Sequence, residues 1–354
     1  MPDPQHPAHT QVIGGVDTHT DTHHAAALNH HGQVLGDAEF PATPDGCTQL
    51  LDWLSGFGPV TTIGVEGTGS YGKQLTTFLR HNDIHVAEVS RPDRKTRRRH
   101  GKSDVIDAIN AARTALSGDN TSTPKTATGP VESIRALRIA RSGAIKARTA
   151  ARNELTNLIT TAPAELREAL RDKRGTALLA ACAALNPDPA RLADPAHGTM
   201  LALRSIAERI TSLNQHITQL DRHLDPLVAA TAPTLVSLLG IGTDVAGQLL
   251  VTAGDNPERL HSEASFAKLC GVAPLPASSG RTDRHRINRG GERQANRALH
   301  ITVVVRLRYC PRTRAYLQRR TEQGLTKRDI IRCLKRYIAR ETHTAILKDL
   351  AAIA

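Results

Sequence analysis

The first third of the chain alternates between short apolar runs and polar turns. The apolar runs have the length and composition of strands, and the segments between them have the three- and four-residue spacing of helices. The predicted strands are Gln11–Val16, Ala25–Leu28, Val34–Phe40, Thr61–Val65 and His85–Val89, and the predicted helices are Asp45–Phe57, Lys73–His81 and Ser103–Leu116. The pattern therefore predicts an α/β domain over residues 11–118, after a polar and disordered lead-in over residues 1–10.

The order of these elements carries further information. Three strands in a meander, followed by alternating helices and strands, is the order of the ribonuclease-H-like fold. In that fold the ends of the first and fourth strands lie side by side. By this analogy we expect the residues that follow Val16 and Val65 to be neighbours.

The remainder of the chain has mostly helical periodicity. Residues 119–130 are rich in Thr, Ser, Gly and Pro, which predicts a linker. Helical spacing continues over residues 131–228, and a mostly helical C-terminal domain is expected over residues 229–354. We therefore expect an α/β part followed by all-α parts.

A heptad pattern stands out in the middle of the chain. Apolar side chains recur there at spacings of three and four over more than three heptads. They are Leu203, Ile206, Ile210, Leu213, Ile217, Leu220, Leu224 and Leu227. Such a seam is typical of a coiled coil through which two chains associate. The alternative is a helical hairpin within one chain, with Val131–Ile159 as the partner helix.

The charge of the chain indicates a polyanionic partner. It has 46 Lys and Arg residues against 34 Asp and Glu, a formal net charge of +12. Such a surplus is typical of proteins that bind nucleic acid. Aromatic residues make up only 3% of the chain, which argues against base-stacking platforms and against an amphipathic membrane anchor.

The cysteines and the apolar runs argue against three further classes of protein. The five cysteines are scattered and form no C-x-x-C pair, which argues against zinc ribbons and a disulfide framework and favours a cytoplasmic protein. No apolar stretch of this sequence reaches the roughly 18–20 residues that span a bilayer, so no membrane partner is expected.

Four carboxylates lie where a metal-dependent nucleic-acid enzyme needs them. Asp17 and Glu66 each end an apolar run. Asp104 and Asp107 are three residues apart, so a helix places both on one face. Acidic groups at strand ends are costly unless a cation satisfies them, and two Mg²⁺ ions held by such a set can cleave a phosphodiester. The alternative is that these residues are ordinary turn residues.

A basic run directly precedes Asp104. Residues 91–102 contain seven Lys or Arg and one acid. The residues of this run that we predict to bind a phosphate backbone are Arg97, Arg98, Arg99 and Lys102. The alternative is a solvated face of the protein.

An apolar turn with two glycines opens the C-terminal part. Leu239-Gly240-Ile241-Gly242 precedes a helical segment and resembles a helix-hairpin-helix, in which backbone N–H groups bind a phosphate. Gly240 and Gly242 are therefore candidate nucleic-acid-binding residues. A plain turn between two helices is the alternative.

A pair of serines lies in a loop that arginines follow. The loop runs over Gly271–Gly280 and includes Ser278 and Ser279. A serine hydroxyl there is a candidate nucleophile for attack on phosphorus, because glycine permits close approach and guanidinium groups stabilise the developing charge. The arginines predicted to bind nucleic acid are Arg281, Arg284, Arg286 and Arg289. An ordinary turn is the alternative.

Taken in order, these motifs resemble those of the insertion-sequence-110 family of transposases, the DEDD/serine recombinases guided by a bridge RNA. The resemblance covers residues 11–345. It is carried by Gly15-Val16-Asp17, Glu66-Gly67-Thr68-Gly69-Ser70-Tyr71, Lys102–Ala108, Leu239–Gly242, Phe266–Pro274, Ser279-Gly280 and Asn288–Gly291.

The resemblance implies a RuvC-like N-terminal domain that binds Mg²⁺ and a C-terminal transposase domain with a nucleophilic serine. The implied DEDD set is Asp17, Glu66, Asp104 and Asp107, and the implied nucleophile is Ser279. The helical middle is implied to mediate dimer contacts. A tetramer on DNA is implied, in which the RuvC-like domain of one subunit meets the serine of another. The implied partners are donor DNA, target DNA and a bridge RNA.

The expected function is therefore that of a transposase that cuts and rejoins DNA. Two alternatives stay open. In a Holliday-junction-type endonuclease the acids alone activate water, and Ser279 is dispensable. A non-catalytic scaffold binds nucleic acid tightly and cleaves nothing.

Overall fold

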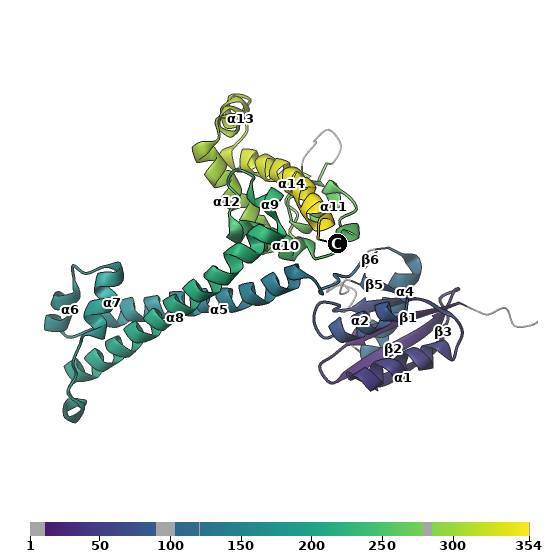
Figure 1. Ribbon diagram of the computed structural model, residues 1–354, viewed down its shortest axis with the longest axis horizontal. Helices are drawn as coiled ribbons and strands as arrows, with labels where there is room; N and C mark the ends of the chain where they lie inside the picture. Colours follow the sequence, from purple (N-terminus) through teal and green to yellow (C-terminus); the bar gives the residue numbers. More distant parts are fainter. Residues whose placement is uncertain (1–10, 90–102, 120, 279–284, 354) are drawn as a thin grey trace, which may run out of the picture. The chain divides into compact units, whose positions relative to one another are not determined.

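The structure is a computed structural model of the 354-residue chain and describes residues 11–89, 103–119, 121–278 and 285–353. The chain forms two compact units. Unit 1 consists of the N-terminal part up to Thr128 together with Ala253–Ser262, and unit 2 consists of Gly129–Thr252 and Glu263–Ala354. Figure 1 labels most of the helices and strands of each unit.

Unit 1 is built around a mixed sheet with the strand order β3-β2-β1-β4-β5-β6. The strands are β1 (Val12–Thr18), β2 (Thr22–Asn29), β3 (Val34–Pro41), β4 (Val60–Glu66), β5 (His85–Val89) and β6 (Thr121–Ser122). The first three strands form an antiparallel meander, and β4 runs parallel to β1 and β5. The expected element order and the pairing of the first and fourth strands are confirmed. The arrangement is consistent with a ribonuclease-H-like fold.

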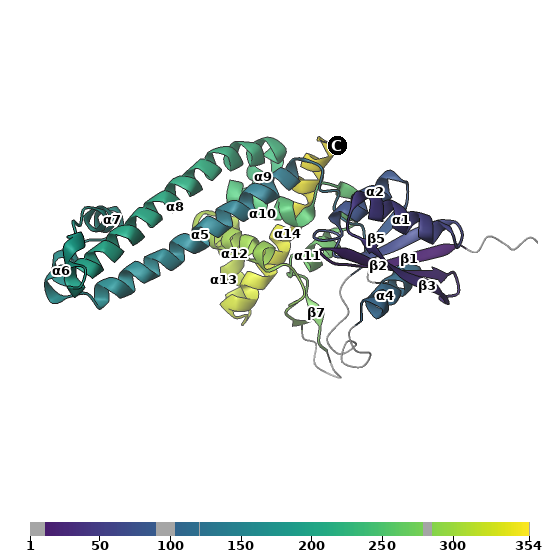
Figure 2. The ribbon, with the colours of Figure 1, turned by 90° about the horizontal axis from the view of Figure 1, so that it is seen from below.

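Helices cover both faces of this sheet. They are α1 (Pro44–Ser55), α2 (Lys73–His81) and α4 (Asp104–Ser117). Figure 2 shows α1 and α2 on one face and α4 on the other. Because side chains alternate along a strand, β1 supplies both cores. Val12 and Val16 join the core under α1 and α2, whereas Ile13 joins the core under α4.

Small residues let α4 lie close to the sheet. A Cβ atom at Gly64 of β4 would lie 2.4 Å from the carbonyl oxygen of Ala111 on α4. Ala108 and Ala112 are fully buried in the core under α4. The backbone of α4 therefore packs directly on β1 and β4, and its first turn lies at the ends of these strands.

A segment from the second half of the sequence completes unit 1. Ala253–Ser262 contains the short 3-10 helix η2 (Pro257–Arg259). Nδ2 of the buried Asn256 donates to the carbonyl oxygen of Pro124 at 3.2 Å, and its Oδ1 accepts from the backbone N–H of Thr126 at 3.2 Å. Part of the segment expected to be a linker is thus ordered against unit 1.

Unit 2 is mainly helical. Its helices are α5 (Pro130–Thr160), α6 (Ala164–Leu170), α7 (Gly175–Ala183), η1 (Pro189–Arg191), α8 (Pro195–Thr231), α9 (Pro233–Val236), α10 (Thr243–Ala253), α11 (Glu263–Leu269), α12 (Arg293–Tyr309), α13 (Pro311–Glu322) and α14 (Lys327–Ala351). Two short strands, β7 (Leu275–Pro276) and β8 (His285–Arg286), form a hairpin. None of the described helices is long and apolar enough to cross a membrane. Each of the five cysteines is a free thiol.

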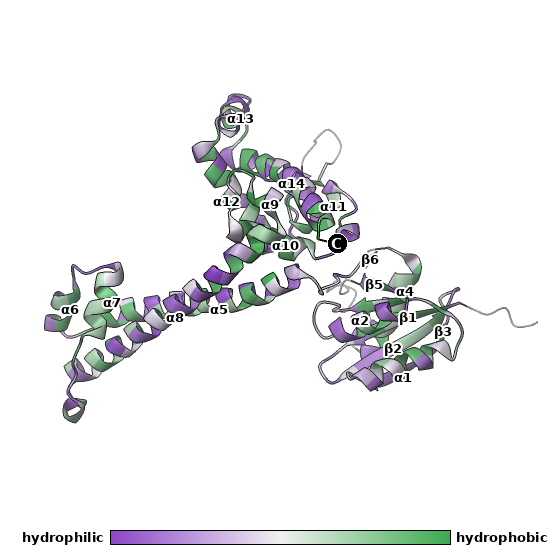
Figure 3. Ribbon diagram, in the orientation of Figure 1, coloured by the Kyte–Doolittle hydropathy of each residue, from purple (hydrophilic) through white to green (hydrophobic). Residues whose placement is uncertain are grey.

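The two longest helices form an antiparallel hairpin. Figure 1 shows α5 and α8 side by side, and both views agree. Polar pairs follow the antiparallel register: Arg148 Nη1 donates to Asn214 Oδ1 at 3.1 Å, and the side chain of Arg141 pairs with that of Asp221. The hydropathy of α8 alternates between hydrophobic and polar along its length, as an amphipathic helix requires (Figure 3).

The heptad residues lie in this hairpin. Every seventh residue from Leu203 is buried: Leu203, Ile210, Ile217 and Leu224. Leu203 and Ile210 share a core with Ala151 and Leu155 of α5. The seam therefore packs within the chain, as the hairpin alternative expects. Ile206, Leu213, Leu220 and Leu227 are half-buried at its edge, and association of two chains through this region stays a prediction.

Candidate active site

The sheet register brings Asp17 and Glu66 together. Val16 of β1 is paired with Val65 of β4, and Asp17 and Glu66 are the next residues of the two strands. Because side chains alternate, Asp17 points to the same face as Gly15, and Glu66 to the same face as Gly64. Both glycines face α4. The two carboxylates therefore lie on the side of the sheet that α4 covers.

Helix α4 brings the other two acids to this edge. Asp104 and Asp107 both lie in its first turn. Ser103 is the N-cap residue as predicted, but its side chain makes no capping hydrogen bond. Asp17, Glu66 and Asp107 are buried to more than nine-tenths, whereas the side chain of Asp104 is 47% exposed. Asp17 thus interacts electrostatically with Asp104 and Asp107, and Glu66 ends the neighbouring strand on the same face of the sheet. Of the four acids, only Asp104 is well exposed.

His19 connects two of these acids. Its Nε2 atom lies 3.2 Å from Oδ2 of Asp17 and 3.3 Å from Oδ1 of Asp104. This nitrogen is buried and has no hydrogen-bond partner of acceptable geometry among the described residues. The imidazole therefore makes an electrostatic contact with both carboxylates without satisfying its ring nitrogen.

The environment raises the pKa of the Asp17 carboxyl. The largest cause is burial, which disfavours the charged form. The nearby His19 opposes this shift, whereas the carboxylates of Asp107 and Asp104 add to it by repulsion. A cation at this position would remove the repulsion and favour ionised Asp17.

These residues fit a divalent metal ion. Ligand atoms of Asp17, His19 and Asp104 lie within 4.8 Å of one another. Mg²⁺ prefers carboxylate oxygens and retains several waters, which suits a cluster with one exposed member. A bound cation would relieve both the repulsion among these acids and the unsatisfied ring nitrogen.

The turn after Glu66 is closely held. Thr18 Oγ1 donates to the backbone carbonyl oxygen of Glu66 at 2.7 Å and joins the ends of β1 and β4. Gly67 follows with a φ of 74°, a left-handed conformation that glycine adopts without strain. Thr68 is buried and donates from Oγ1 to Glu88 Oε1 at 2.9 Å. The backbone that carries Glu66 is thus fixed from both neighbouring strands.

Several predicted site residues fall outside the described part of the chain. They are Arg97, Arg98, Arg99, Lys102, Ser279, Arg281 and Arg284. Of the predicted arginines that the structure describes, Arg286 lies on β8 and Arg289 follows it, and both are exposed. The roles of all these residues stay predictions.

The described base of the serine loop is tightly built. A Cβ atom at Gly291 would lie 2.1 Å from the backbone nitrogen of Gly271, so the two glycines permit contact between backbones. Nδ2 of Asn296 donates to the carbonyl oxygen of Gly271 at 2.8 Å, and its Oδ1 accepts from Lys335 Nζ at 2.8 Å. Burial lowers the pKa of this lysine. Polar contacts from α12 and α14 therefore fix the start of the loop.

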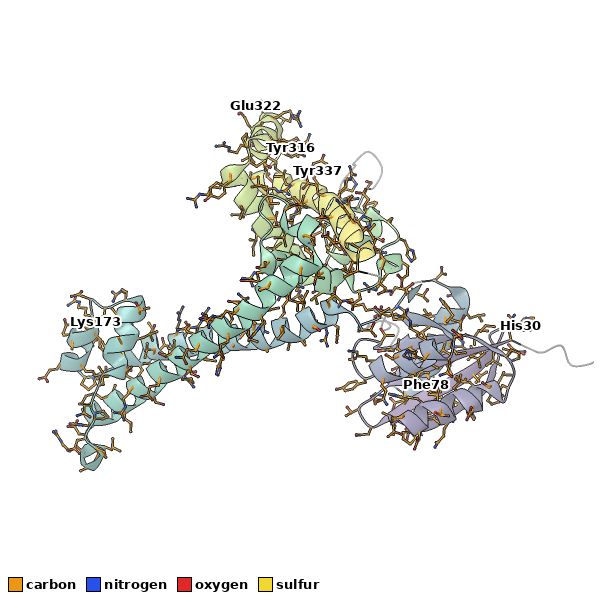
Figure 4. All side chains as sticks on the ribbon, viewed as in Figure 1. His30, Phe78, Lys173, Tyr316, Glu322 and Tyr337 are labelled. Atoms are coloured by element: carbon orange, nitrogen blue, oxygen red, sulfur yellow. The ribbon has the colours of Figure 1, made fainter. Side chains whose placement is uncertain are left out.

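A basic pocket of about 830 Å³ lies beside this loop base. Its walls come from the loop, from β8 and from α12 and α14, and Tyr337 lies on it with its ring edge-on to that of Tyr316 (Figure 4). Among the described lining residues there is one carboxylate, Asp329, which pairs with Arg332 at 2.7 Å. The cationic lining residues are Arg286, Lys327, Arg328, Arg332, Lys335 and Arg336. The lining thus carries a surplus of positive charge.

The glycine turn before α10 has a packing role. Gly240 has a φ of 82°, and a Cβ atom there would contact the side chain of Val305 at 3.3 Å. Nothing lies near a Cβ atom at Gly242. The helix before the turn, α9, has only 4 residues, so the first helix is shorter than that of a full helix-hairpin-helix. Binding of phosphate by Gly240 and Gly242 stays a prediction.

Sequence reasoning missed two groups of residues. His19 follows Asp17 by two positions, and this D-x-H spacing was the available signal. Asn296 and Lys335 come from helices far apart in the sequence, and no local pattern marks them as partners.

Comparison with known proteins agrees with the motifs. One family model, described as a transposase and named for the DEDD enzymes of IS110, matches residues 14–164. A second, described as the transposase IS116/IS110/IS902 family, matches residues 232–318. The uncharacterized 43.6 kDa protein of insertion element IS110 from Streptomyces coelicolor is 31% identical over 137 residues, 37% of this chain. The match spans 33% of that protein's length. The four acids lie in the first matched region, and Ser279 lies in the second.

Proposed function

Because the chain belongs to the IS116/IS110/IS902 family of transposases, we propose that it cuts and rejoins DNA during the movement of an insertion sequence. The observation that carries this proposal is the gathering of four acids at one edge of the unit 1 sheet. Asp17 is buried and repelled by Asp107 and Asp104, an arrangement that destabilises a protein without a cation, so the gathering of acids here favours a catalytic role.

We propose that Asp17, Glu66, Asp104 and Asp107 hold Mg²⁺. When bound, such ions stabilise the charge that develops on a phosphodiester during cleavage. The chain supplies and orients the ligands. Thr18 fixes the backbone of Glu66, and His19 keeps Asp17 and Asp104 within reach of one ion.

We propose Ser279 as the nucleophile. Its hydroxyl oxygen forms a bond to phosphorus while the bond from phosphorus to the leaving DNA oxygen breaks. The serine proton ends on that leaving oxygen, which becomes a DNA hydroxyl, and the DNA phosphate stays joined to serine. Attack by the hydroxyl of a second DNA end reverses these bond changes and regenerates the serine. The neighbouring arginines, Arg281, Arg284, Arg286 and Arg289, would neutralise the developing charge.

We further propose that donor DNA, target DNA and a bridge RNA are the partners, and that the chain acts as a dimer that forms a tetramer on DNA. The net charge of +12 and the basic pocket of unit 2 support binding of nucleic acid. Family membership supports the guide RNA and the oligomer.

The test uses a DNA substrate with a nick near the cleavage point, which traps a covalent intermediate. The wild-type chain with Mg²⁺ and its guide should form a DNA–protein adduct that survives denaturation, and Ser279→Ala should form none. Ser278→Ala is the matched control and should keep at least part of the adduct. Mass spectrometry of the adduct identifies the modified residue.

Three other outcomes decide against parts of the proposal. Clean hydrolytic nicking by Ser279→Ala would favour a Holliday-junction-type endonuclease, in which the acids activate water. Adduct formation that persists in EDTA, or in Asp17→Ala, would remove the metal role. Tight binding without any cleavage would favour a scaffold.

A further inference from the structure

Glu88 of β5 lies behind the acid cluster. It is paired with Val65, whose side chain belongs to the core under α1 and α2, so Glu88 points away from the face that carries Glu66. Its Oε1 accepts from Thr68 Oγ1 at 2.9 Å, and its Oε2 accepts from Ser122 Oγ at 3.1 Å. This carboxylate therefore connects β6 with the turn that follows Glu66.

That turn has its own hydrogen bonds. The backbone N–H groups of Ser70 and Gly72 both donate to the carbonyl oxygen of Gly67, at 2.9 and 3.1 Å. Thr68 lies inside this turn and is buried. A movement of Glu88 would therefore displace Thr68 and the rigid turn together, and Glu66 is the residue immediately before it.

Arg259 supplies the countercharge to Glu88. Its Nη2 atom lies 3.5 Å from Oε2 of Glu88, and its side chain is only 11% exposed. The guanidinium is also fixed by the backbone: Nε donates to the carbonyl oxygen of Thr123 at 2.9 Å, and Nη1 to that of Ala253 at 3.1 Å. Three contacts at fixed positions leave this side chain little freedom.

We propose that Arg259 is a positioning residue for the acid site. Arg259 orients the carboxylate of Glu88, and Glu88 in turn holds Thr68. Because Thr68 belongs to the turn that follows Glu66, these contacts set the position of Glu66 for metal binding. The inference rests on the proposed role of the acids as metal ligands. It makes the site of unit 1 dependent on Ala253–Ser262, the segment that leads directly into α11 and the serine-bearing part of the sequence.

Binding of Mn²⁺ to the full chain without DNA tests this inference separately from cleavage. Free Mn²⁺ is followed by its electron paramagnetic resonance signal at a temperature where each variant is folded by circular dichroism. We expect Arg259→Met to weaken binding about tenfold, the lower end of the effect of removing a direct outer-shell partner of a metal ligand. Arg259→Lys keeps the charge near Glu88 and should restore part of the affinity.

A matched control separates positioning from general destabilisation. Arg306 is also 11% exposed, pairs with Glu341 at 2.6 Å and donates to the carbonyl oxygen of Leu239 at 2.7 Å, all within unit 2. Arg306→Met should lower the melting temperature but leave the affinity for Mn²⁺ unchanged.

The route through Glu88 is tested by a double-mutant cycle. In a Glu88→Gln background, Arg259→Met should have little further effect on the affinity for Mn²⁺. Unchanged affinity in Arg259→Met, or a full tenfold loss in the Glu88→Gln background, overturns the inference. If Arg259→Met weakens Mn²⁺ binding as expected but the wild-type chain forms no DNA adduct, the inference stands and the proposed strand transfer fails.

Discussion

Gly15 on β1 lies directly beneath Ala112 on α4, and a Cβ atom at Gly15 would be 2.1 Å from the backbone nitrogen of Ala112. No side chain fits at this point of contact. The absence of a side chain on β1 therefore sets the distance between the sheet and the helix that carries Asp104 and Asp107.

Gly15→Ala should displace α4 and separate the acids. Overpacking of a close contact costs about 1–3 kcal/mol, and a shift of about 1 Å at a reacting centre reduces rates about a hundredfold. We expect a lower free energy of unfolding in urea and a corresponding loss of Mg²⁺-dependent cleavage. Gly69→Ala is the control, because nothing lies within 4 Å of a Cβ atom there. Equal effects of both changes would show that close packing of α4 is unimportant.

Asp17→Asn should have opposite effects on stability and activity. Burial and the repulsion of Asp107 and Asp104 raise the pKa of Asp17, so the neutral amide should stabilise the metal-free protein. Loss of a metal ligand should remove several kcal/mol of transition-state stabilisation, on the order of a thousandfold in cleavage rate. Calorimetry with and without Mg²⁺ measures the first effect. A lower melting temperature of Asp17→Asn without metal would contradict the description of a strained acid cluster.

Ile210→Asp should unfold the helical hairpin, not merely separate two chains. Ile210 is fully buried in the core shared by α5 and α8, and an unpaired charge there is expected to cost more than about 3 kcal/mol. Circular dichroism should show that the helices of Ile210→Asp unfold at a lower temperature than those of the wild type. Ser212→Asp on the exposed face is the control. If Ile210→Asp is instead a fully folded monomer, the heptad seam is an interface between chains and not the core of the hairpin.

The ion pairs of Glu263 make the stability of unit 2 sensitive to acid. Hydrogen bonds and charge from Arg340 and Arg336 hold the pKa of Glu263 at about 2, below its ordinary value of 4.5. A carboxylate with a lowered pKa stabilises the fold above its unfolded pKa, and this contribution is lost as pH falls from about 4.5 towards 2. Glu263→Gln should therefore be less stable than wild type at neutral pH, and the difference should vanish near pH 2.

A second carboxyl on the same unit serves as the control for this pH dependence. Glu322 at the end of α13 is exposed and accepts from the neutral amide of Gln318 at 3.1 Å (Figure 4). Glu322→Gln should have the same free energy of unfolding as the wild type across the same pH range. If Glu263→Gln is still less stable than wild type at pH 2, the ion pairs with the arginines are not the cause of the difference in stability.

The basic pocket should contribute to the salt dependence of nucleic-acid binding. Arg286, Lys327 and Arg328 are three of its cationic lining residues. Replacing all three by Gln should flatten the slope of log K against log salt by roughly two to three, since each phosphate contact contributes about 0.7–0.9. Fluorescence anisotropy of a labelled oligonucleotide measures the slope. An unchanged slope would assign the pocket to another ligand.

The sequence by itself determined the local elements and the kind of chemistry. Lys73–His81 and His85–Val89 begin and end where the periodicity predicts. The reason is that the periodicity of a helix or strand depends on residues that are close together in the sequence. The acids at the ends of two apolar runs were recognisable for the same reason, and so was the heptad pattern from Leu203 to Leu227.

Only the tertiary structure decided which of these elements meet. The parallel pairing of β1 with β4 places Glu66 beside Asp17, and the glycine contact brings α4 to both. The heptad seam packs against α5 of the same chain, although its sequence is equally compatible with packing against a second copy of the chain. Arg259 reaches Glu88 from the other half of the sequence. Such pairings depend on the burial of apolar surface and on close packing between segments that are distant in the sequence. No local pattern specifies which apolar face packs against which partner.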